Sequence, residues 1–347
     1  MIKMTSRLFS YKSMNQYKIF CAACAIFIIP VLARTFWLLN FPAGQAPAIQ
    51  NYPSKPKSWP SEGVVPACMM QEGDKEMFKS HSHFSVASLL SGVNEIYALY
   101  ALRLGVSIRK FVDVDMLLLI PVQQNGSVNA KDFRQTLENP IYRDLKMVGW
   151  RTCFVPALSR SGLDGDDYHS AYVYTKLAAW NLSYEAVLLI DLDTLIVGDN
   201  SPLFEDLSHS LRQRGSAFAA AMDHPQSWSP RWTPAGDRFN SGVILLLPSP
   251  NLFKWLVQGI DYIQHPEGLA EQSYLNVAMR QKHIELPLEY NAMTVIAYSE
   301  PWVWTNILPN IRILHFTFPK PHMAQRCEDY NVREICEFWN NSPTVLE

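Results

Sequence analysis

Two aspartates one residue apart, Asp191 and Asp193, follow directly on an apolar run at residues 186–190. A run that is so short and so apolar predicts a strand buried on both faces, as in a parallel sheet. Ligands of open α/β sheets bind beyond the carboxyl ends of strands, which is where these two acids fall. Neighbouring carboxylates repel each other unless a cation lies between them, and Mg²⁺ or Mn²⁺ suits oxygen ligands and often carries substrate phosphates. The pair therefore predicts a site for a metal ion and a diphosphate.

The same spacing occurs at Asp113 and Asp115, which precede their apolar run, residues 116–120, instead of following it. This position at the wrong end of a strand predicts a solvated turn for that pair. Phosphohydrolases also place Asp-x-Asp after a buried strand, but their motif usually continues with a spacer residue before Thr. Here Thr194 follows Asp193 directly. We therefore rank a metal-dependent phosphohydrolase below the site for a metal ion and a diphosphate.

The elements that position the acidic pair follow from the order of apolar segments. Strands are expected at residues 83–90, 116–121, 186–190, 218–222, 239–248 and 311–315, with a helix end and a strand within 144–155. Helices are expected at residues 96–104, 172–182, 251–263 and 271–280. This alternation indicates the α/β class, with a twisted, mostly parallel sheet covered by helices on both faces. Loops are expected at residues 161–167 and at 224–234, and the second is close enough in sequence to the pair to cover a substrate.

Length and charge limit the class of protein. The chain has 347 residues, enough for one large α/β domain with additional segments. Its formal net charge of −2 implies no polyanionic partner, so nucleic acid is not expected. The expected organisation is a cytosolic tail at residues 1–18, a signal anchor at 19–39, a Pro-rich stem at 40–76 and a globular catalytic domain at 77–347.

The amino-terminal segments indicate a secretory destination. Four basic residues and no acid precede the apolar segment, which predicts a single-pass type II membrane protein with a lumenal domain. The alternative is a cleaved signal peptide ending near Ala33, which would give a secreted protein. The four cysteines beyond this segment, at positions 68, 153, 327 and 336, could form two bridges. Pairing of the last two is the more natural choice from their proximity.

Five segments occur in an order that identifies a family: residues 174–180, 188–193, 239–243, 271–276 and 315–321. With them, from about His83 to Pro321, the chain resembles glycosyltransferase family 8, the retaining enzymes that include glycogenin, galactinol synthase and plant xylan glucuronosyltransferases. The resemblance implies a Rossmann-like GT-A fold. Together with the expected amino-terminal anchor, it leads us to expect a protein of the Golgi membrane. It also implies a hexosyltransferase with Mn²⁺ (alternatively Mg²⁺), a UDP-sugar donor, and a glycan, polysaccharide or glycolipid acceptor.

The resemblance also implies roles for residues on the metal and phosphate side. Carried over by position, Asp191, Asp193 and His315 would ligate the metal, and Asp193 would also count among the catalytic residues. Lys320, five residues after His315, would contact the donor phosphates. Lys176 matches a family lysine that contacts donor groups.

Further residues are implied on the uracil and sugar side of the donor. Tyr97 aligns with an aromatic residue that stacks on the uracil. Asn240 and Ser241 fit a loop that hydrogen-bonds the donor sugar. Gln272 falls beside the anomeric carbon, and its neighbour Glu271 replaces the more frequent Asp; both count as catalytic candidates.

Several alternatives remain open at the level of sequence. The family's closing segment here lacks a Gly and ends in His322, so the loop that closes on the phosphates is expected to differ in shape. A same-face displacement in which a UDP oxygen helps to deprotonate the acceptor is preferred, and a double displacement through Glu271 stays open. A nucleotide-sugar-binding protein that has lost transfer is the alternative from another class, against which the complete set of metal ligands argues. Membrane contact through the amino-terminal helix is expected, and a homodimer is left open.

Overall fold

The computed structural model describes Cys68 and residues 83–91, 95–122, 140–160, 172–223, 238–265 and 270–345. The chain divides into two compact units, Met1–Trp59 and Pro60–Glu347, and every described residue belongs to the second. The predicted tail and anchor, nearly all of the stem, the expected domain start at residue 77 and the loops at 161–167 and 224–234 lie outside the described residues. Within the described ranges, no helix is both long and apolar enough to cross a bilayer.

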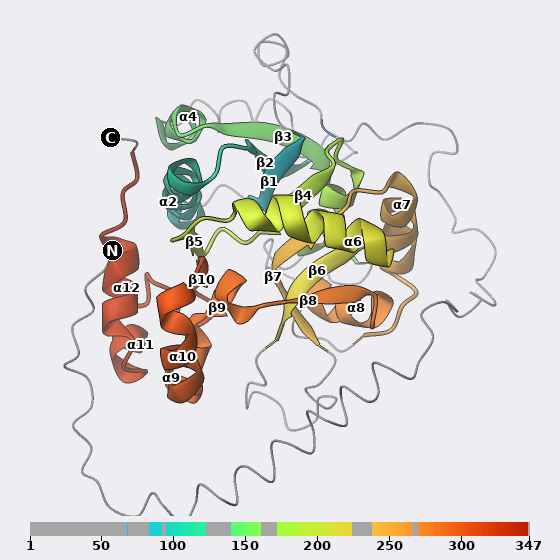
Figure 1. Ribbon diagram of the computed structural model, residues 1–347. Coiled ribbons are helices and arrows are strands. Elements are labelled where there is room, and N and C mark those ends of the chain that lie inside the picture. Colours follow the sequence, from blue (N-terminus) through green and yellow to red (C-terminus); the bar gives the residue numbers. More distant parts are fainter. Residues whose placement is uncertain are drawn as a thin grey trace, which may run out of the picture. The chain divides into compact units, whose positions relative to one another are not determined.

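The described strands and helices alternate up to residue 190, and beyond it strands or helices also follow one another directly (Figure 1). The strands are β1 (Phe84–Leu89), β2 (Asp115–Val122), β3 (Trp150–Pro156), β4 (Ala186–Ile190), β5 (Thr194–Ile196), β6 (Phe218–Met222), β7 (Phe239–Leu246), β8 (His283–Leu286), β9 (Ala292–Met293) and β10 (Ile313–His315). The α-helices are α2 (Glu95–Phe111), α4 (Pro140–Met147), α6 (Ser208–Arg214), α7 (Pro250–Gly259), α8 (Ala270–Ala278), α9 (Thr294–Ser299), α10 (Pro301–Ile307), α11 (Ala324–Asp329) and α12 (Arg333–Asn340). Shorter 3-10 helices are η2 (Val173–Asn181), η5 (Leu288–Tyr290) and η6 (Leu308–Asn310), and η3 (Leu203–Leu207) is a π-helix.

Seven strands form the main sheet in the order β3-β2-β1-β4-β7-β6-β8. β7 is antiparallel to both of its neighbours, whereas the other neighbouring pairs are parallel. The carboxyl ends of β1, β4 and β6 therefore meet the amino end of β7 at one edge of the sheet. The expected α/β class with a mostly parallel sheet is confirmed, and the reversed β7 is an addition that the apolar pattern did not indicate.

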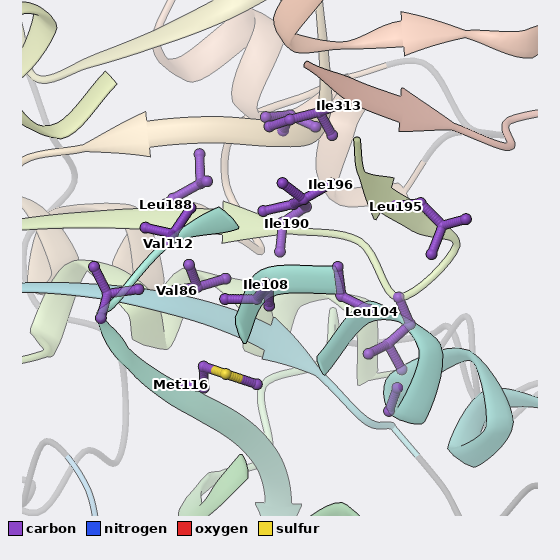
Figure 2. Close-up of a cluster of buried hydrophobic side chains, with 14 of the residues drawn as sticks. Val86, Leu104, Ile108, Val112, Met116, Leu188, Ile190, Leu195, Ile196 and Ile313 are labelled. Carbon is purple, nitrogen blue, oxygen red and sulfur yellow. The ribbon is translucent and has the colours of Figure 1, made fainter. Parts of the chain in front are cut away.

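The two faces of the sheet carry separate cores. Along β4, Leu188 and Ile190 belong to one buried cluster, whereas Val187 and Leu189 belong to the other. Helices α2, α6 and α12 contribute to the first cluster, and η2, α7 and α8 contribute to the second. Figure 2 shows the first cluster, where side chains of β4 and α2 gather with Ile313 of β10. Helices thus cover both faces, as predicted, and each fully buried aliphatic side chain contributes about 1.5–3 kcal/mol.

A second, three-stranded sheet has its first strand, β5, directly after the acidic pair. In it β10 is antiparallel to β5 and parallel to β9. His315 at the end of β10 pairs with Thr194 at the start of β5, and the Phe316 N–H donates to the Asp193 carbonyl at 2.9 Å. The strand expected at residues 311–315 is therefore correct in position but belongs to this second sheet. Its pairing brings His315 beside Asp193.

The solvated turn expected at Asp113 and Asp115 is wrong for the second residue. Asp115 is the first residue of β2 and is buried. Its carboxylate lies 2.8 Å from Arg151 Nη2 and accepts a hydrogen bond from the Tyr184 hydroxyl at 2.9 Å. The compensating cation, Arg151, lies on the neighbouring strand β3, so the spacing of residues around Asp115 does not reveal it. Asp113 is exposed, as expected.

The segment at residues 172–182, expected as a helix, forms the 3-10 helix η2. Over nine residues the spacing of apolar side chains does not separate i→i+3 from i→i+4 hydrogen bonds. Seven of its side chains are buried, so packing against the sheet and α7 holds the segment in place. Lys176 is thereby carried on a rigid element.

Two disulfides join the four cysteines. One links Cys327 in α11 to Cys336 in α12, which is the pairing that proximity favoured. The other links Cys68 to Cys153 in β3, across a sequence separation of 85 residues.

Candidate functional site

The acidic pair lies in the turn that leaves β4. The Asp191 N–H donates to the Gly242 carbonyl of β7 at 2.8 Å, and the Thr194 hydroxyl donates to the Asp191 carbonyl at 2.7 Å. These bonds hold the backbone of the turn between two strands that belong to different sheets. A cavity opens beside it, and its lining includes Tyr97, Lys176, Asp191, Asp193 and Lys320.

Asp191, Asp193 and His315 form a group with the chemistry of a metal site. Their ligand atoms all lie within 4.8 Å of one another, and His315 Nε2 is 3.5 Å from Asp193 Oδ1. Two carboxylate oxygens and one imidazole nitrogen form a donor set that fits Mn²⁺, and the oxygens suit Mg²⁺ as well. The imidazole is buried and can approach only because Gly242 has no side chain, since a Cβ there would overlap the His315 ring. The residues present therefore fit a divalent ion.

Lys176 supplies the positive charge on one side of the group. Its Nζ lies 2.6 Å from Asp191 Oδ1 and 2.7 Å from Glu271 Oε1. Burial by itself lowers the pKa of Lys176, but the charges of Asp191 and Glu271 outweigh it and raise that pKa above its ordinary value. The ammonium is therefore charged at neutral pH and joins the turn after β4 to α8.

Lys320 supplies the charge on the other side, where it forms an ion pair with Asp193. Burial by itself raises the pKa of Asp193, but the ammonium of Lys320 more than offsets this and holds the pKa well below its usual range. Burial likewise lowers the pKa of Lys320, and Asp193 more than offsets it, so the pKa is raised. Asp193 is thus a carboxylate and Lys320 an ammonium at neutral pH.

Polar side chains from the residue after β6, from the start of β7 and from α8 meet at the amino end of the reversed strand. The Ser241 N–H donates to Gln272 Oε1 at 2.9 Å, and the Ser241 hydroxyl donates to Glu271 Oε1 at 3.2 Å. Asn240 Nδ2 and Gln272 Nε2 donate to the two oxygens of Asp223, at 3.2 Å and 3.0 Å. The result is a set of amides whose orientation is fixed by hydrogen bonds.

Sequence reasoning missed two residues of this set, Asp223 and Asn291. Asp223 directly follows β6, whose carboxyl end lies at the same edge of the sheet as that of β4. An acid placed directly after an apolar strand is the signal that singled out Asp191, and it could have identified Asp223. Asn291 is fully buried, and its Oδ1 lies 2.8 Å from His315 Nδ1. No local pattern indicates that contact, because it joins residues from separate elements.

The structure brings every predicted site residue into one neighbourhood. Tyr97 lies on α2 and lines the cavity with both aspartates and both lysines. The remaining residues connect to this cavity through the contact of Lys176 with Glu271. They also connect through His315 and Asn291, whose Nδ2 donates to Asn240 Oδ1 at 3.0 Å. The predicted residues placed together are Tyr97, Lys176, Asp191, Asp193, Asn240, Ser241, Glu271, Gln272, His315 and Lys320. His322, the departure noted in the closing segment, shares a hydrogen bond of 2.6 Å between its Nδ1 and the Tyr100 hydroxyl.

Comparison with known proteins gives one family. The model described as "Glycosyl transferase family 8" matches residues 90–321. Galactinol synthase 4 of Arabidopsis thaliana is 25% identical over 166 residues, which cover 41% of this chain and 47% of that protein. The chain thus spans about half the length of this curated relative.

Two solved structures have similar chain traces. The galactosyltransferase LgtC, in complex with donor and acceptor sugar analogues, is 16% identical with a TM-score of 0.48, over 76% of this chain and 98% of that chain. The glycosyltransferase GlyE of Streptococcus pneumoniae TIGR4 is 18% identical with a TM-score of 0.46, over 76% of this chain and 64% of that chain.

Proposed function

The chain belongs to glycosyl transferase family 8, and from this premise we propose that it is a metal-dependent retaining hexosyltransferase with a GT-A fold. It would transfer a hexosyl-type sugar from a UDP-sugar to a glycan, polysaccharide or glycolipid acceptor. The observation that carries this proposal is the convergence of Asp191, Asp193 and His315, whose ligand atoms lie within 4.8 Å of one another at the carboxyl end of β4.

These three residues would hold Mn²⁺, or alternatively Mg²⁺. The ion would supply Lewis-acid stabilisation of the charge that develops on the departing UDP oxygen, an effect worth several kcal/mol. Lys320, which forms an ion pair with Asp193, would contact the donor phosphates. Tyr97, which lines the same cavity, would stack on the uracil.

The amide set at the start of β7 is assigned to the donor sugar. Asn240, Ser241 and Gln272 present polar atoms there, and Asp223 holds two of the amides in a fixed orientation. Pre-oriented donors of this kind need no reorganisation during the reaction. Asp223 therefore joins the proposed donor site as a positioning residue.

A same-face displacement agrees best with the surroundings of Glu271. In it the bond from the anomeric carbon to the UDP oxygen breaks, a bond to the acceptor oxygen forms on the same face, and the acceptor proton passes to the departing UDP oxygen. A double displacement would need a free carboxylate as nucleophile. The Glu271 side chain is 7% exposed, and its Oε1 both pairs with Lys176 and accepts a hydrogen bond from Ser241, so the charge of this carboxylate is already compensated within the protein.

We further propose that the enzyme resides in the Golgi membrane with its catalytic domain in the lumen. Two disulfides support this compartment, because such bonds persist in the oxidising secretory pathway and are rare in the cytosol. Protease protection of a carboxyl-terminal tag in intact microsomes, lost on addition of detergent, is the expected result. Cleavage of the tag without detergent would contradict a lumenal domain.

The decisive experiment is a donor panel with purified protein. UDP-glucose, UDP-galactose, UDP-glucuronate, UDP-xylose and UDP-N-acetylglucosamine are assayed for hydrolysis with and without Mn²⁺. At least one donor should be hydrolysed only with the metal, and Asp193→Asn should lower that turnover at least about a hundredfold, because it removes a charged ligand. Asp113→Asn, an exposed aspartate in the same Asp-x-Asp spacing, is the matched control and should keep full turnover. Equal turnover in wild type and Asp193→Asn would overturn the metal assignment.

A further inference from the structure

The orientation of the buried amides near the metal group is set by a backbone N–H. The two ends of a side-chain amide are distinguished only by the donors and acceptors around them. Asn240 Oδ1 lies 3.0 Å from the Gly242 nitrogen, and a peptide N–H can only donate. The atom of Asn240 at this position is therefore the oxygen, and its Nδ2 must be the end that faces Asp223.

The same reasoning extends one residue further, to the imidazole. Asn291 contacts Asn240 Oδ1 at 3.0 Å, and since that oxygen only accepts, the contacting atom of Asn291 must be Nδ2. Its Oδ1 is then the end that lies 2.8 Å from His315 Nδ1. An amide oxygen cannot donate, so Nδ1 of His315 must carry the proton. In the neutral ring this leaves the lone pair on Nε2, the nitrogen that lies 3.5 Å from Asp193 Oδ1.

A second backbone N–H orients the amide of Gln272, on the other side of Asp223. The Ser241 N–H donates to Gln272 at 2.9 Å, which identifies the contacting atom as Oε1 and directs Nε2 to Asp223. The consecutive N–H groups of Ser241 and Gly242 therefore fix the orientation of the Gln272 and Asn240 amides. Both amides donate to the carboxylate of Asp223. A chain of hydrogen bonds therefore joins His315 to Gln272, and the donor and the acceptor of each bond in it are fixed.

We propose that Asn291 is the positioning residue that fixes the Nδ1–H tautomer of His315 and links that ring, through Asn240 and Asp223, to Gln272. As far as it concerns the metal, this inference rests on the proposed function. Asn291 is 0% exposed and His315 is 3% exposed, so water does not replace the amide oxygen. Outer partners of metal-binding histidines are typically worth 10- to 100-fold in metal affinity.

Two substitutions separate the two hydrogen bonds of Asn291. Asn291→Ala removes both, and Mn²⁺ affinity, measured by calorimetric titration in the absence of donor, should fall at least about tenfold. Asn291→Asp keeps an oxygen that can accept from His315 Nδ1–H. Its other oxygen would face Asn240 Oδ1, and the hydrogen bond between these two residues is lost because neither oxygen carries a proton. Its Mn²⁺ affinity should equal or exceed that of the wild type, while kcat for donor hydrolysis should fall.

The matched control is Asn200→Ala. Asn200 is also 0% exposed, and its Nδ2 donates to the Gly198 carbonyl at 2.8 Å, outside the network. It should leave Mn²⁺ affinity unchanged. Wild-type Mn²⁺ affinity in folded Asn291→Ala, or an equal loss in the control, would overturn the role of Asn291. If Asn291→Ala does not fold, weaker Mn²⁺ binding by Asn291→Asp than by the wild type does the same.

The tautomer itself gives a test that needs neither metal nor donor. Nitrogen NMR of the metal-free protein, recorded at a pH where the ring is neutral and with the His315 signals identified by their loss in His315→Gln, should show a protonated Nδ1 and an unprotonated Nε2. A neutral ring that carries its proton on Nε2 would overturn the inference even if the enzyme is an active transferase. Failure of the wild type to bind Mn²⁺ would instead overturn the proposed function, and the NMR result would still decide the tautomer.

Discussion

The charge of Lys176 is shared between two carboxylates, and this has a measurable consequence for stability. Its side chain is 12% exposed and that of Glu271 is 7% exposed, so neither ion is well hydrated once its partner is lost. Removing one partner of a buried ion pair typically costs about 3–5 kcal/mol. We therefore expect Lys176→Met to lower the free energy of unfolding by about that amount, measured by urea denaturation.

A double-mutant cycle completes this test. Combining Lys176→Met with Glu271→Gln should cost less than the sum of the two single variants, because Glu271→Gln removes a charge that Lys176→Met leaves unpaired. The exposed pair of Arg333 and Glu328, 3.0 Å apart, is the control, and its coupling energy should be below about 1 kcal/mol. Additive effects at Lys176 and Glu271 would show that the buried pair contributes no coupling.

Gly242 controls how closely His315 can approach the acidic pair. A Cβ at this position would overlap the imidazole, and neighbouring atoms are too tightly packed to absorb it. We expect Gly242→Ala to displace the ring and to weaken Mn²⁺ binding at least about tenfold, a loss similar to that from an altered outer partner. Gly215→Ala is the control, because Gly215 has φ +62° and nothing within 4 Å of its would-be Cβ. It should cost about 1 kcal/mol of stability through backbone strain and leave Mn²⁺ affinity unchanged.

At the scale of elements, α12 supports the end of β10 through one tryptophan. Trp339 is 1% exposed, and its ring centroid lies 4.7 Å from those of both Tyr100 on α2 and Phe316 just after β10. Trp339→Ala should therefore cost about 3–5 kcal/mol in the free energy of unfolding. Because Phe316 follows His315 directly, Mn²⁺ affinity should fall as well. Trp302→Ala, at a tryptophan that is 64% exposed, should change stability by no more than about 0.5 kcal/mol.

Elements formed by apolar runs were predictable, and those formed by pairing were not. The strand before Asp191 ends where its apolar run ends, since burial on both faces leaves a continuous signal. The three-residue strand β5 was not predicted, and its pairing with β10, which places both in a second sheet, depends on no local pattern. The helix type of η2 and the burial of Asp115 were missed for a similar reason: packing and a partner on another strand decide them.

At the scale of the whole molecule, one reversed strand explains why polar residues from distant segments meet. β7 runs opposite to the other strands of its sheet, so its amino end, with Asn240 and Ser241, lies beside the carboxyl ends of β4 and β6. Acids after those two strands and polar side chains at the start of β7 are therefore brought to one edge. Single-sequence patterns give each strand but not its direction, so the family resemblance was needed to group these residues before the structure was known.

The two disulfides should stabilise the molecule unequally, because they close loops of different length. Cys68 and Cys153 are 85 residues apart, whereas Cys327 and Cys336 are 9 apart. In the chain-entropy treatment, the longer loop corresponds to about 4.6 kcal/mol and the shorter to about 2.6 kcal/mol. Paired alanine substitutions at each bridge, compared by denaturant unfolding, should therefore differ by about 2 kcal/mol, with the Cys68–Cys153 pair the more costly. Equal losses would mean that native-state packing, and not the restricted unfolded chain, determines what each bridge contributes.

The two bridges should also differ in their effect on Mn²⁺ binding. Cys327 and Cys336 lie in a small core at α11 and α12, and α12 also carries Trp339. Loss of that bridge should therefore weaken Mn²⁺ binding, whereas loss of the other should not.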